Sequence, residues 1–286
     1  MSRYIIGLEI HIKRIEVAVV DLDSNSIVLG THVKQFIDSQ ETLENLLNCW
    51  TETIEECLKL HGSDVDRIGI AIPGPFDYEK GISLMKNMGK FDALYGLNLK
   101  ELLGDRLNKS PENIRTANTA PCFLQGEVAH GTCKGFNNIL GLILSAGFGS
   151  ARYVDGVASD ADLWRVPFKN SIANTYFDIK WISDRYEEFT GIKTTDIKEL
   201  IKLAKTDDGI GQLVFGEYGE NFSTFLGEYV KRYNSDLVVV GGYYDAGDLF
   251  LPHVKDRLLD MRIDVKVKTA QLGNVAALFG AAYLWN

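Results

Sequence analysis

Cysteine is scarce in this 286-residue chain. The four that occur share neither a CxxC nor a Cys/His zinc spacing: Cys49, Cys57, Cys122 and Cys133. So few cysteines do not indicate a disulfide scaffold. Long hydrophobic runs are missing too, since no stretch approaches the roughly 18 residues of a membrane span. The chain also reaches Glu9 too early for a signal-peptide core. We therefore expect a cytoplasmic protein without a membrane partner.

Positive charge is also in short supply. The sequence has 30 Lys and Arg against 39 Asp and Glu, a net charge of −9 and a pI near 5.1. Its densest basic stretches, Lys13-Arg14 and residues 198–205, are broken by carboxylates or apolar residues. An acidic chain without a basic patch repels nucleic acid and anionic membranes. We therefore expect no nucleic-acid partner.

The rest of the composition is that of a folded protein, with 45% hydrophobic and 24% charged residues. Its length is about twice that of a typical domain, which predicts two lobes. Three β-branched runs, residues 4–10, 15–22 and 27–36, predict an antiparallel meander. Ser39 is the expected N-cap of a helix that ends near His61-Gly62.

A buried strand, residues 67–72, then runs into the turn Pro73-Gly74-Pro75, which can continue neither a ladder nor a helix. The second half restarts with a similar unit. We expect a strand over 138–144, a glycine-containing turn over 145–150, and a strand over 151–154 that ends at Asp155-Gly156. Its likeness to residues 5–23 predicts an internal repeat and a duplicated α/β architecture.

Helical periodicity follows over residues 176–190, 195–205 and 213–233. A buried strand, residues 236–242, comes directly after it. The Gly241-Gly242 end of that strand would let a ligand approach the backbone, although its alternative interpretation is a tight turn. Tyr243 and Tyr244 would narrow the space beyond it, which counts against a nucleotide there.

Five stretches, in this order along the chain, resemble the ROK family of sugar kinases and repressors. They are "IGIAIPGPFDYEKGISL" (68–84), "NTAPCFLQGE" (118–127), "LILSAGFGSARYVDG" (142–156), "LVVVGGYYDAGDLF" (237–250) and "LGNVAALFGAAYL" (272–284). The resemblance implies an α/β, two-lobed actin/hexokinase-like (ribonuclease H-like) fold, each lobe having a mixed central sheet flanked by helices. We expect a smaller lobe over 1–116 plus 273–286, a larger lobe over 117–272, and a ligand cleft between them.

The stretch "ADLWRVPFKNSIANTYFDIKWISDRYEEFTG" (161–191) resembles a zinc-free branch of this family. We therefore expect no zinc and no other bound metal. In the family, ATP phosphorylates a sugar 6-hydroxyl, an aspartate takes the hydroxyl proton, and two glycine-rich hairpins with Mg²⁺ hold the phosphates. Positioning and electrostatics supply most of such catalysis.

The first phosphate hairpin of the family corresponds here to Glu9-Ile10-His11-Ile12-Lys13-Arg14, which replaces both glycines and a hydroxyl. Backbone N–H groups must face the phosphates without a Cβ in the way, so Ile12 would obstruct them. His11 and Lys13 could form an unusual phosphate clamp, but we favour a strand with one face in solvent. Glu9 and Lys13 are then remnants of the nucleotide site.

The catalytic Asn-Asp-Ala element of the family corresponds to Asn118-Thr119-Ala120. Thr119 cannot serve as the base, because its hydroxyl has no useful proton affinity near neutral pH. The second phosphate hairpin reads Ser145-Ala146-Gly147 and has lost its phosphate-facing hydroxyl. No catalytic residue is therefore expected intact.

The remaining site residues also come from the resemblance. Gly74, Asn87, Asn118 and Asp162 are the expected sugar contacts. Each has a simpler interpretation: Gly74 as a turn, the asparagines as loop residues, and Asp162 as a surface carboxylate. The remnants of the nucleotide site in the second half are Ser145, Ala146, Gly147, Gly241 and Gly242.

These losses favour a ROK-like pseudokinase that binds a sugar-like ligand and lacks, or is impaired in, phosphotransfer. The alternative is an active kinase for a hexose or amino sugar, binding MgATP and taking its base from elsewhere, for instance Asp162 or Glu9. Transcriptional regulation is disfavoured, since the chain begins at its first strand and leaves no room for a helix-turn-helix. A scaffold role stays open, and a homodimer is expected by family analogy.

Overall fold

The computed structural model describes residues 4–194, 196–206, 209–242 and 246–286. The chain forms two compact units. Residues 1–131 and 274–286 make up the first, and residues 132–273 the second. The sequence placed the first boundary at residue 116, whereas the structure keeps helix α3 (Thr119–His130) in the first unit. The reason is its packing on α9 (Ala276–Ala282), where a Cβ on Gly280 would lie 1.7 Å from the carbonyl O of Cys122.

The first unit is built on a mixed six-stranded sheet. Its strands are β1 (Tyr4–His11), β2 (Arg14–Asp21), β3 (Ser26–Ile27), β4 (Val33–Phe36), β5 (Ile68–Ile72) and β8 (Ile114–Asn118). The order is β3-β2-β1-β5-β8, with β4 also paired to β2. The β1–β2 pair is antiparallel, and β1, β5 and β8 run parallel. The central strands β1, β2 and β5 are almost wholly buried because both faces of the sheet are covered there.

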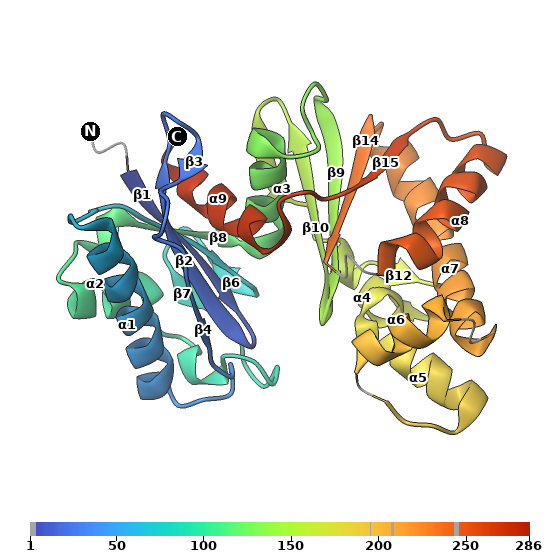
Figure 1. The fold of residues 1–286 in the computed structure, drawn as a ribbon, viewed down its shortest axis with the longest axis horizontal. Helices are drawn as coiled ribbons and strands as arrows, with labels where there is room; N and C mark the ends of the chain where they lie inside the picture. Colours follow the sequence, from blue (N-terminus) through green and yellow to red (C-terminus); the bar gives the residue numbers. More distant parts are fainter. Residues whose placement is uncertain (1–3, 195, 207–208, 243–245) are drawn as a thin grey trace. The chain divides into compact units, whose positions relative to one another are not determined.

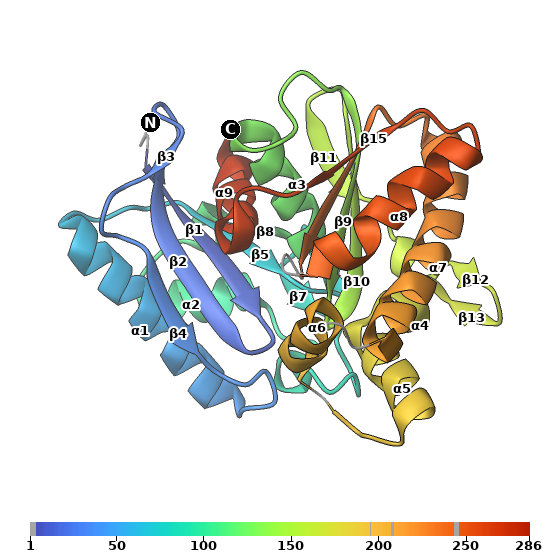
Figure 2. The same ribbon diagram turned by 45° about the vertical axis from the view of Figure 1, so that its right-hand side comes forward.

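Helices cover each face of this sheet (Figures 1 and 2). On one face α1 (Leu43–His61) and α2 (Leu99–Leu107) enclose a core around Trp50, which contacts Phe91 at 5.9 Å between ring centroids. On the other face α9 and α3 pack together. A small hairpin, β6 (Phe76–Asp77) with β7 (Ile82–Ser83), follows β5 in the sequence.

Two local predictions for the first unit are wrong. The run 27–36 is two strands, β3 and β4, because Gly30 turns the chain at φ 83° and the hydroxyl of Thr31 donates to Val28 O and accepts from Val19 N. Helix α1 starts after Thr42, whose Oγ1 accepts from Asn45 N. Ser39 is instead buried, with its backbone bonded to Ile12 and Phe91. The predicted helix end is confirmed, since Gly62 is the C-cap.

The second unit repeats the sheet plan of the first. Its strands are β9 (Asn138–Ser145), β10 (Gly147–Val154), β11 (Val157–Asp160), β14 (Leu237–Gly242) and β15 (Lys266–Thr269), in the order β11-β10-β9-β14-β15. Again an antiparallel hairpin, β9–β10, leads a run of parallel strands, β9, β14 and β15. The predicted duplication is therefore confirmed in topology. The predicted turn over 145–150 is wrong, because only Ala146 separates the two strands of the hairpin.

The helices of this unit gather on one side of its sheet (Figure 1). They are α4 (Ala173–Phe177), α5 (Ile179–Thr190), α6 (Ile197–Lys205), α7 (Gly209–Tyr233) and α8 (Gly247–Asp260), with a short hairpin of β12 (Pro167–Phe168) and β13 (Ser171–Ile172) before them. The helix predicted over 176–190 is broken at Asp178, whose carboxylate caps α5 by accepting from Lys180 N. The start predicted at Thr195 lies outside the described residues. Of the described helices, none is long and apolar enough to cross a membrane.

Candidate functional site

The carboxyl ends of three parallel strands meet at one edge of the first sheet. Glu9 of β1 pairs with Ala71 of β5, and Ile72 of β5 pairs with Asn118 of β8. Gly74 follows two residues after Ile72. Ligands of α/β sheets bind at the carboxyl ends of strands. We therefore take this edge, with Glu9, Gly74 and Asn118, as the candidate site of the first unit and call it the strand-end site.

Tyr78 joins two of the predicted sugar-binding residues. Its hydroxyl donates to Ile72 O (3.2 Å) and accepts from Nδ2 of Asn118 (3.0 Å). A Cβ on Gly74 would lie 2.8 Å from the same hydroxyl, so a glycine leaves room for the tyrosine. The structure thus brings Gly74 and Asn118 together through a side chain that sequence reasoning missed. Its position within a family-like stretch was the only signal.

Asn118 also begins helix α3. Its Oδ1 accepts from Ala120 N at 2.9 Å, which makes it the N-cap. Thr119 is the first residue of the helix and is half-buried. The strand-end site therefore carries a threonine hydroxyl at the position where the family resemblance implies the catalytic carboxylate. Such a hydroxyl does not accept a proton near neutral pH.

Asn87 lies in an exposed loop after β7 with φ 54°. Asparagine tolerates this left-handed conformation, so the backbone alone accounts for the residue type. The start of the loop is tied to the turn around Gly74, because Leu84 N donates to Pro75 O at 3.1 Å. Among the described contacts, none joins Asn87 itself to Gly74 or Asn118.

Glu9 is a buried carboxylate, with 6% of its surface exposed. Burial raises its pKa to about 7, against the opposing effect of Arg14, whose guanidinium lies 3.4 Å from Oε2. Its partner across the β1–β2 ladder is Glu16. Burial alone would raise the pKa of Glu16 as well, but hydrogen bonds from His32, Arg14 and Lys34 lower it to about 2. Two facing carboxylates therefore differ widely in proton affinity.

Hydrogen bonds join the turn between β1 and β2 to the segment that follows β4. Ile12 O accepts from Ser39 N (2.9 Å), and Lys13 O accepts from Ile37 N (3.2 Å). The ammonium of Lys13 pairs with Asp38. His11 adds no positive charge at neutral pH, since burial, with Arg14 nearby, lowers its pKa to about 4. A phosphate cradle needs open backbone N–H groups and free cations. Here the N–H of Lys13 donates to Nδ1 of His11 at 3.4 Å and its ammonium is paired, so these residues do not fit a Mg²⁺-bound triphosphate.

The β9–β10 hairpin of the second unit carries Ser145, Ala146 and Gly147. Ser145 pairs with Gly147, whose φ of 140° favours glycine. The hydroxyl of Ser145 reaches Gly147 O at 3.4 Å. Next to the turn, Phe148 N donates to Oδ1 of Asn174 at 2.9 Å. At this end of the hairpin, a backbone donor is thus already bound by a side chain of the same chain.

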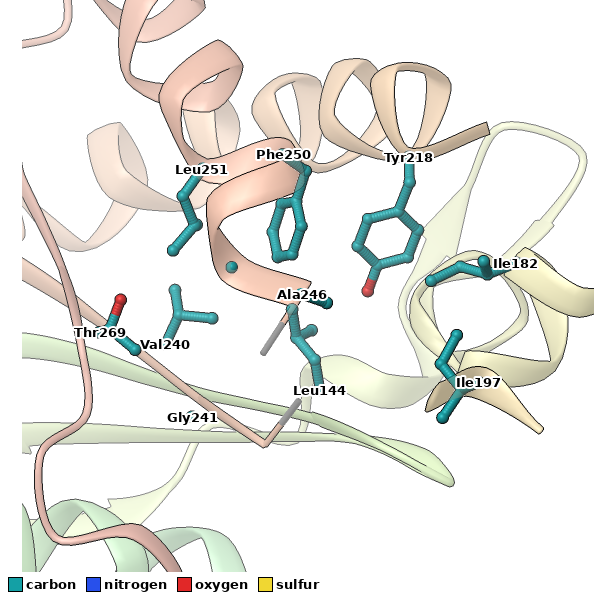
Figure 3. Close-up of a pocket in the computed structure, with 11 residues that line it drawn as sticks. Leu144, Ile182, Ile197, Tyr218, Val240, Gly241, Ala246, Phe250, Leu251 and Thr269 are labelled. Carbon is teal, nitrogen blue, oxygen red and sulfur yellow. The ribbon is translucent and has the colours of Figure 1, made fainter. Parts of the chain in front are cut away.

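Gly241 and Gly242 end β14 beside β9. A Cβ on Gly242, at φ 102°, would lie 1.8 Å from Leu144 O, so only glycine fits there. Gly241 contributes to a small apolar pocket (Figure 3). Side chains from α5, α6, α7 and α8 line it with the two strands: Leu144, Ile182, Ile197, Tyr218, Val240, Phe250 and Leu251. Tyr243 and Tyr244, predicted to narrow this space, lie outside the described residues.

Asp162 stands in a left-handed conformation at φ 53° after β11. Its carboxylate pairs with Arg165, and its N–H donates to Oδ1 of Asp160 at 2.8 Å. Leu163, the next residue, donates to the hydroxyl of Ser150 at 2.9 Å. The carboxylate is partly exposed and already pairs with Arg165. A sugar hydroxyl that bound it would share the carboxylate with that arginine. In the described parts of the chain, no cluster of three or more His, Cys, Asp or Glu side chains could hold a metal ion.

A sequence model of one protein family matches more than half of the chain. The model of the ROK family matches residues 5–164. The chain belongs to the ROK family. The match ends at Trp164.

Known proteins agree with this family in sequence and in fold. An N-acetyl-D-glucosamine kinase of Photobacterium profundum is 25% identical over 76% of this chain and 79% of its own. A ROK glucokinase of Streptomyces griseus, solved with glucose and AMPPNP, matches 98% of both chains with a TM-score of 0.79 and 19% identity. A ROK transcriptional regulator, a homologue of the E. coli MLC protein, matches 98% of this chain and 76% of its own at a TM-score of 0.76 and 16% identity.

These matches establish the two-lobed α/β fold of the ROK hexokinases and the sugar-kinase-like character of the chain. They include proteins named for catalysis and one named for transcriptional regulation. Since one fold hosts different functions, the activity has to be argued from the site residues.

Proposed function

We propose that this ROK protein binds a sugar-type ligand, a hexose or amino sugar, at the strand-end site and is impaired in ATP-dependent phosphotransfer. One observation carries the second part: Thr119 opens helix α3 where the family resemblance implies the catalytic carboxylate. Without that base, the proton-transfer share of the rate, about 10²- to 10⁴-fold, is lost. Asp162 of the second unit and Asn87 are further proposed sugar contacts.

The state of the phosphate elements supports this proposal. In the β1–β2 turn the ammonium of Lys13 is paired with Asp38, and the backbone N–H of Lys13 donates to Nδ1 of His11. The Ser145–Gly147 hairpin keeps its glycine but lacks the family hydroxyl. We accordingly propose no bound MgATP and no zinc for the first candidate.

An active sugar kinase is the second candidate, and the comparisons fit it better than the first. Its curated relatives are named as N-acetyl-D-glucosamine kinases, and nothing in the comparisons favours an inactive protein. One structural observation also favours it. Glu9 lies near the carboxyl end of β1, at the strand-end site, with a pKa of about 7, the range of an effective general base. In that case Glu9 takes the hydroxyl proton and MgATP supplies the phosphoryl group.

Phosphotransfer to a panel of hexoses and amino sugars distinguishes the two candidates. Wild-type protein, Thr119→Asp and Thr119→Asn would be assayed with MgATP by phosphorus NMR. An aspartate at the first turn of α3 is favoured by the helix dipole, so the variant should fold. The first candidate predicts no phosphotransfer above background for wild type, T119D or the asparagine variant, because a restored carboxylate supplies a base but no phosphate site.

A different pattern supports the second candidate. Wild-type phosphorylation that T119D does not accelerate and that Glu9→Gln abolishes would identify Glu9 as the base and refute the first proposal. Calorimetric titration of the same sugars tests the ligand. If no sugar of the panel binds, with or without MgATP, the sugar-site proposal is wrong for both candidates.

We also propose a homodimer in the cytoplasm, by family analogy and from the sequence. Light scattering on the purified chain and fractionation of its cells would measure both.

A further inference from the structure

Glu9 and Glu16 face each other on the antiparallel β1–β2 ladder. Side chains at opposed positions of such a ladder are about 5 Å apart at Cβ, and like charges there repel. Both carboxylates are buried, with 7% and 2% of their side chains exposed. A pair of close, buried carboxylates needs a cation, and hard divalent cations such as Mg²⁺ take oxygen ligands of this kind.

Arg14 supplies that cation from within the strand. It precedes Glu16 by two residues, so both side chains lie on one face of β2. Its Nε donates to Oε1 of Glu16 at 2.6 Å, and its terminal N–H lies 3.4 Å from Oε2 of Glu9. Only 16% of the arginine side chain is exposed. The planar guanidinium reaches both carboxylates with separate N–H groups, which a lysine ammonium could not do in the same geometry.

Further positive groups complete the cluster around Glu16. Lys34 of β4 lies 3.2 Å from Oε1, and His32 lies 3.0 Å from Oε2. Arg14 and Lys34 thus place two positive charges beside the two carboxyl groups. A divalent ion added here would meet both of these cations.

We propose that Arg14 is a built-in cation of the strand-end site, holding beside Glu9 and Glu16 the charge that a divalent metal ion would otherwise bring, so that ligand binding here is independent of Mg²⁺. The inference deepens the proposed function at the same site. It also assigns a function to the residues that replace the glycines of the family hairpin in this chain. This stretch has no glycine after Gly7, and it holds an arginine that contacts two buried carboxyl groups.

The test uses Mn²⁺ alone as the probe, with neither sugar nor nucleotide, and follows the electron paramagnetic resonance signal of the free ion. The proteins are wild type, Arg14→Gln, the double variant R14Q/E9Q, and Arg165→Gln as a matched control that loses an arginine–carboxylate pair elsewhere. We expect wild type and R165Q to leave the signal unchanged. R14Q should bind one equivalent of Mn²⁺ and so reduce the signal of the free ion. The double variant R14Q/E9Q should not bind it.

Two results would overturn the inference. One is stoichiometric Mn²⁺ binding by the wild type that Glu9→Gln abolishes. The other is a folded R14Q, verified by circular dichroism, that binds no Mn²⁺. If R14Q does not fold, Arg14→Lys takes its place. A lysine ammonium cannot contact both carboxylates as the guanidinium does, so R14K must bind more Mn²⁺ than the wild type for the inference to stand. Since no phosphotransfer is measured, failure here leaves the proposed function untouched, and the reverse also holds.

Discussion

Replacing Glu9 with glutamine should stabilise the protein, and only above acidic pH. Burial raises the pKa of this carboxyl from 4.5 to about 7. Between those two values the folded state binds more protons than the unfolded state, so stability falls as the pH rises. Each pH unit of this interval corresponds to about 1.4 kcal/mol. The charged Glu9 therefore lowers the free energy of unfolding by about 3 kcal/mol once the pH exceeds its folded pKa.

Glutamine has nearly the shape of the protonated carboxyl but cannot ionise. We expect Glu9→Gln to match wild type at about pH 4.5 and to exceed it by up to ~3 kcal/mol at about pH 8. The two units can unfold separately, so the assay should report on the first. Urea unfolding followed by pulsed hydrogen exchange of β1 and β2 peptides does so. Glu112→Gln, the same substitution at an exposed position, is the control.

A variant that is destabilised by a similar amount at every pH would refute this reasoning. That result would mean that the attraction of Arg14 lowers the pKa of Glu9 by more than burial raises it, so that Glu9 stays charged. It would also remove the basis for Glu9 as a general base, because a carboxylate with an ordinary or lowered pKa accepts protons poorly.

Three further predictions follow from the same structure. Glu16→Gln should cost about 3 kcal/mol at neutral pH, because the pKa of Glu16 is lowered to about 2, and the difference should vanish as the pH falls from 4.5 toward 2 in urea titrations. Gly242→Ala should destabilise the second unit by about 3 kcal/mol or more, well beyond Gly191→Ala, which shares a positive φ but has open space around it; thermal unfolding would measure both. Tyr78→Phe should cost about 1–2 kcal/mol and weaken sugar binding in calorimetry, whereas unchanged values would mean that its two hydrogen bonds are replaced by water.

The fold was largely predictable because its signals are local. Strands β1, β2, β5, β9 and β14 are β-branched runs, and their bounds differ from the predicted ones by about a residue. The errors arose where one side chain decides the backbone. Thr31 ends β3 by bonding to residues 19 and 28, and Asp178 breaks a continuous helical pattern by capping the next helix.

The candidate site was predictable only as a set of positions. Which residues meet there depends on pairing between distant segments: Tyr78 and Asn118 are 40 residues apart. The bridge made by Arg14 did have a signal in the sequence. A two-residue turn at Ile12-Lys13 places Glu9 opposite Glu16, with Arg14 on the same face. That signal was hidden by the assumption that the hairpin had merely lost its glycines.

The return of α9 to the first unit also constrains how this protein is made. The helix follows the whole second unit in the sequence, yet it packs on the β1–β5 face, where a Cβ on Gly69 would lie 1.9 Å from Ala281 O. During translation, at ~5–20 residues per second, the apolar face around Ile5 and Ala71 stays uncovered until residues 276–282 leave the ribosome. The first unit therefore cannot complete its packing until the second unit has been synthesised.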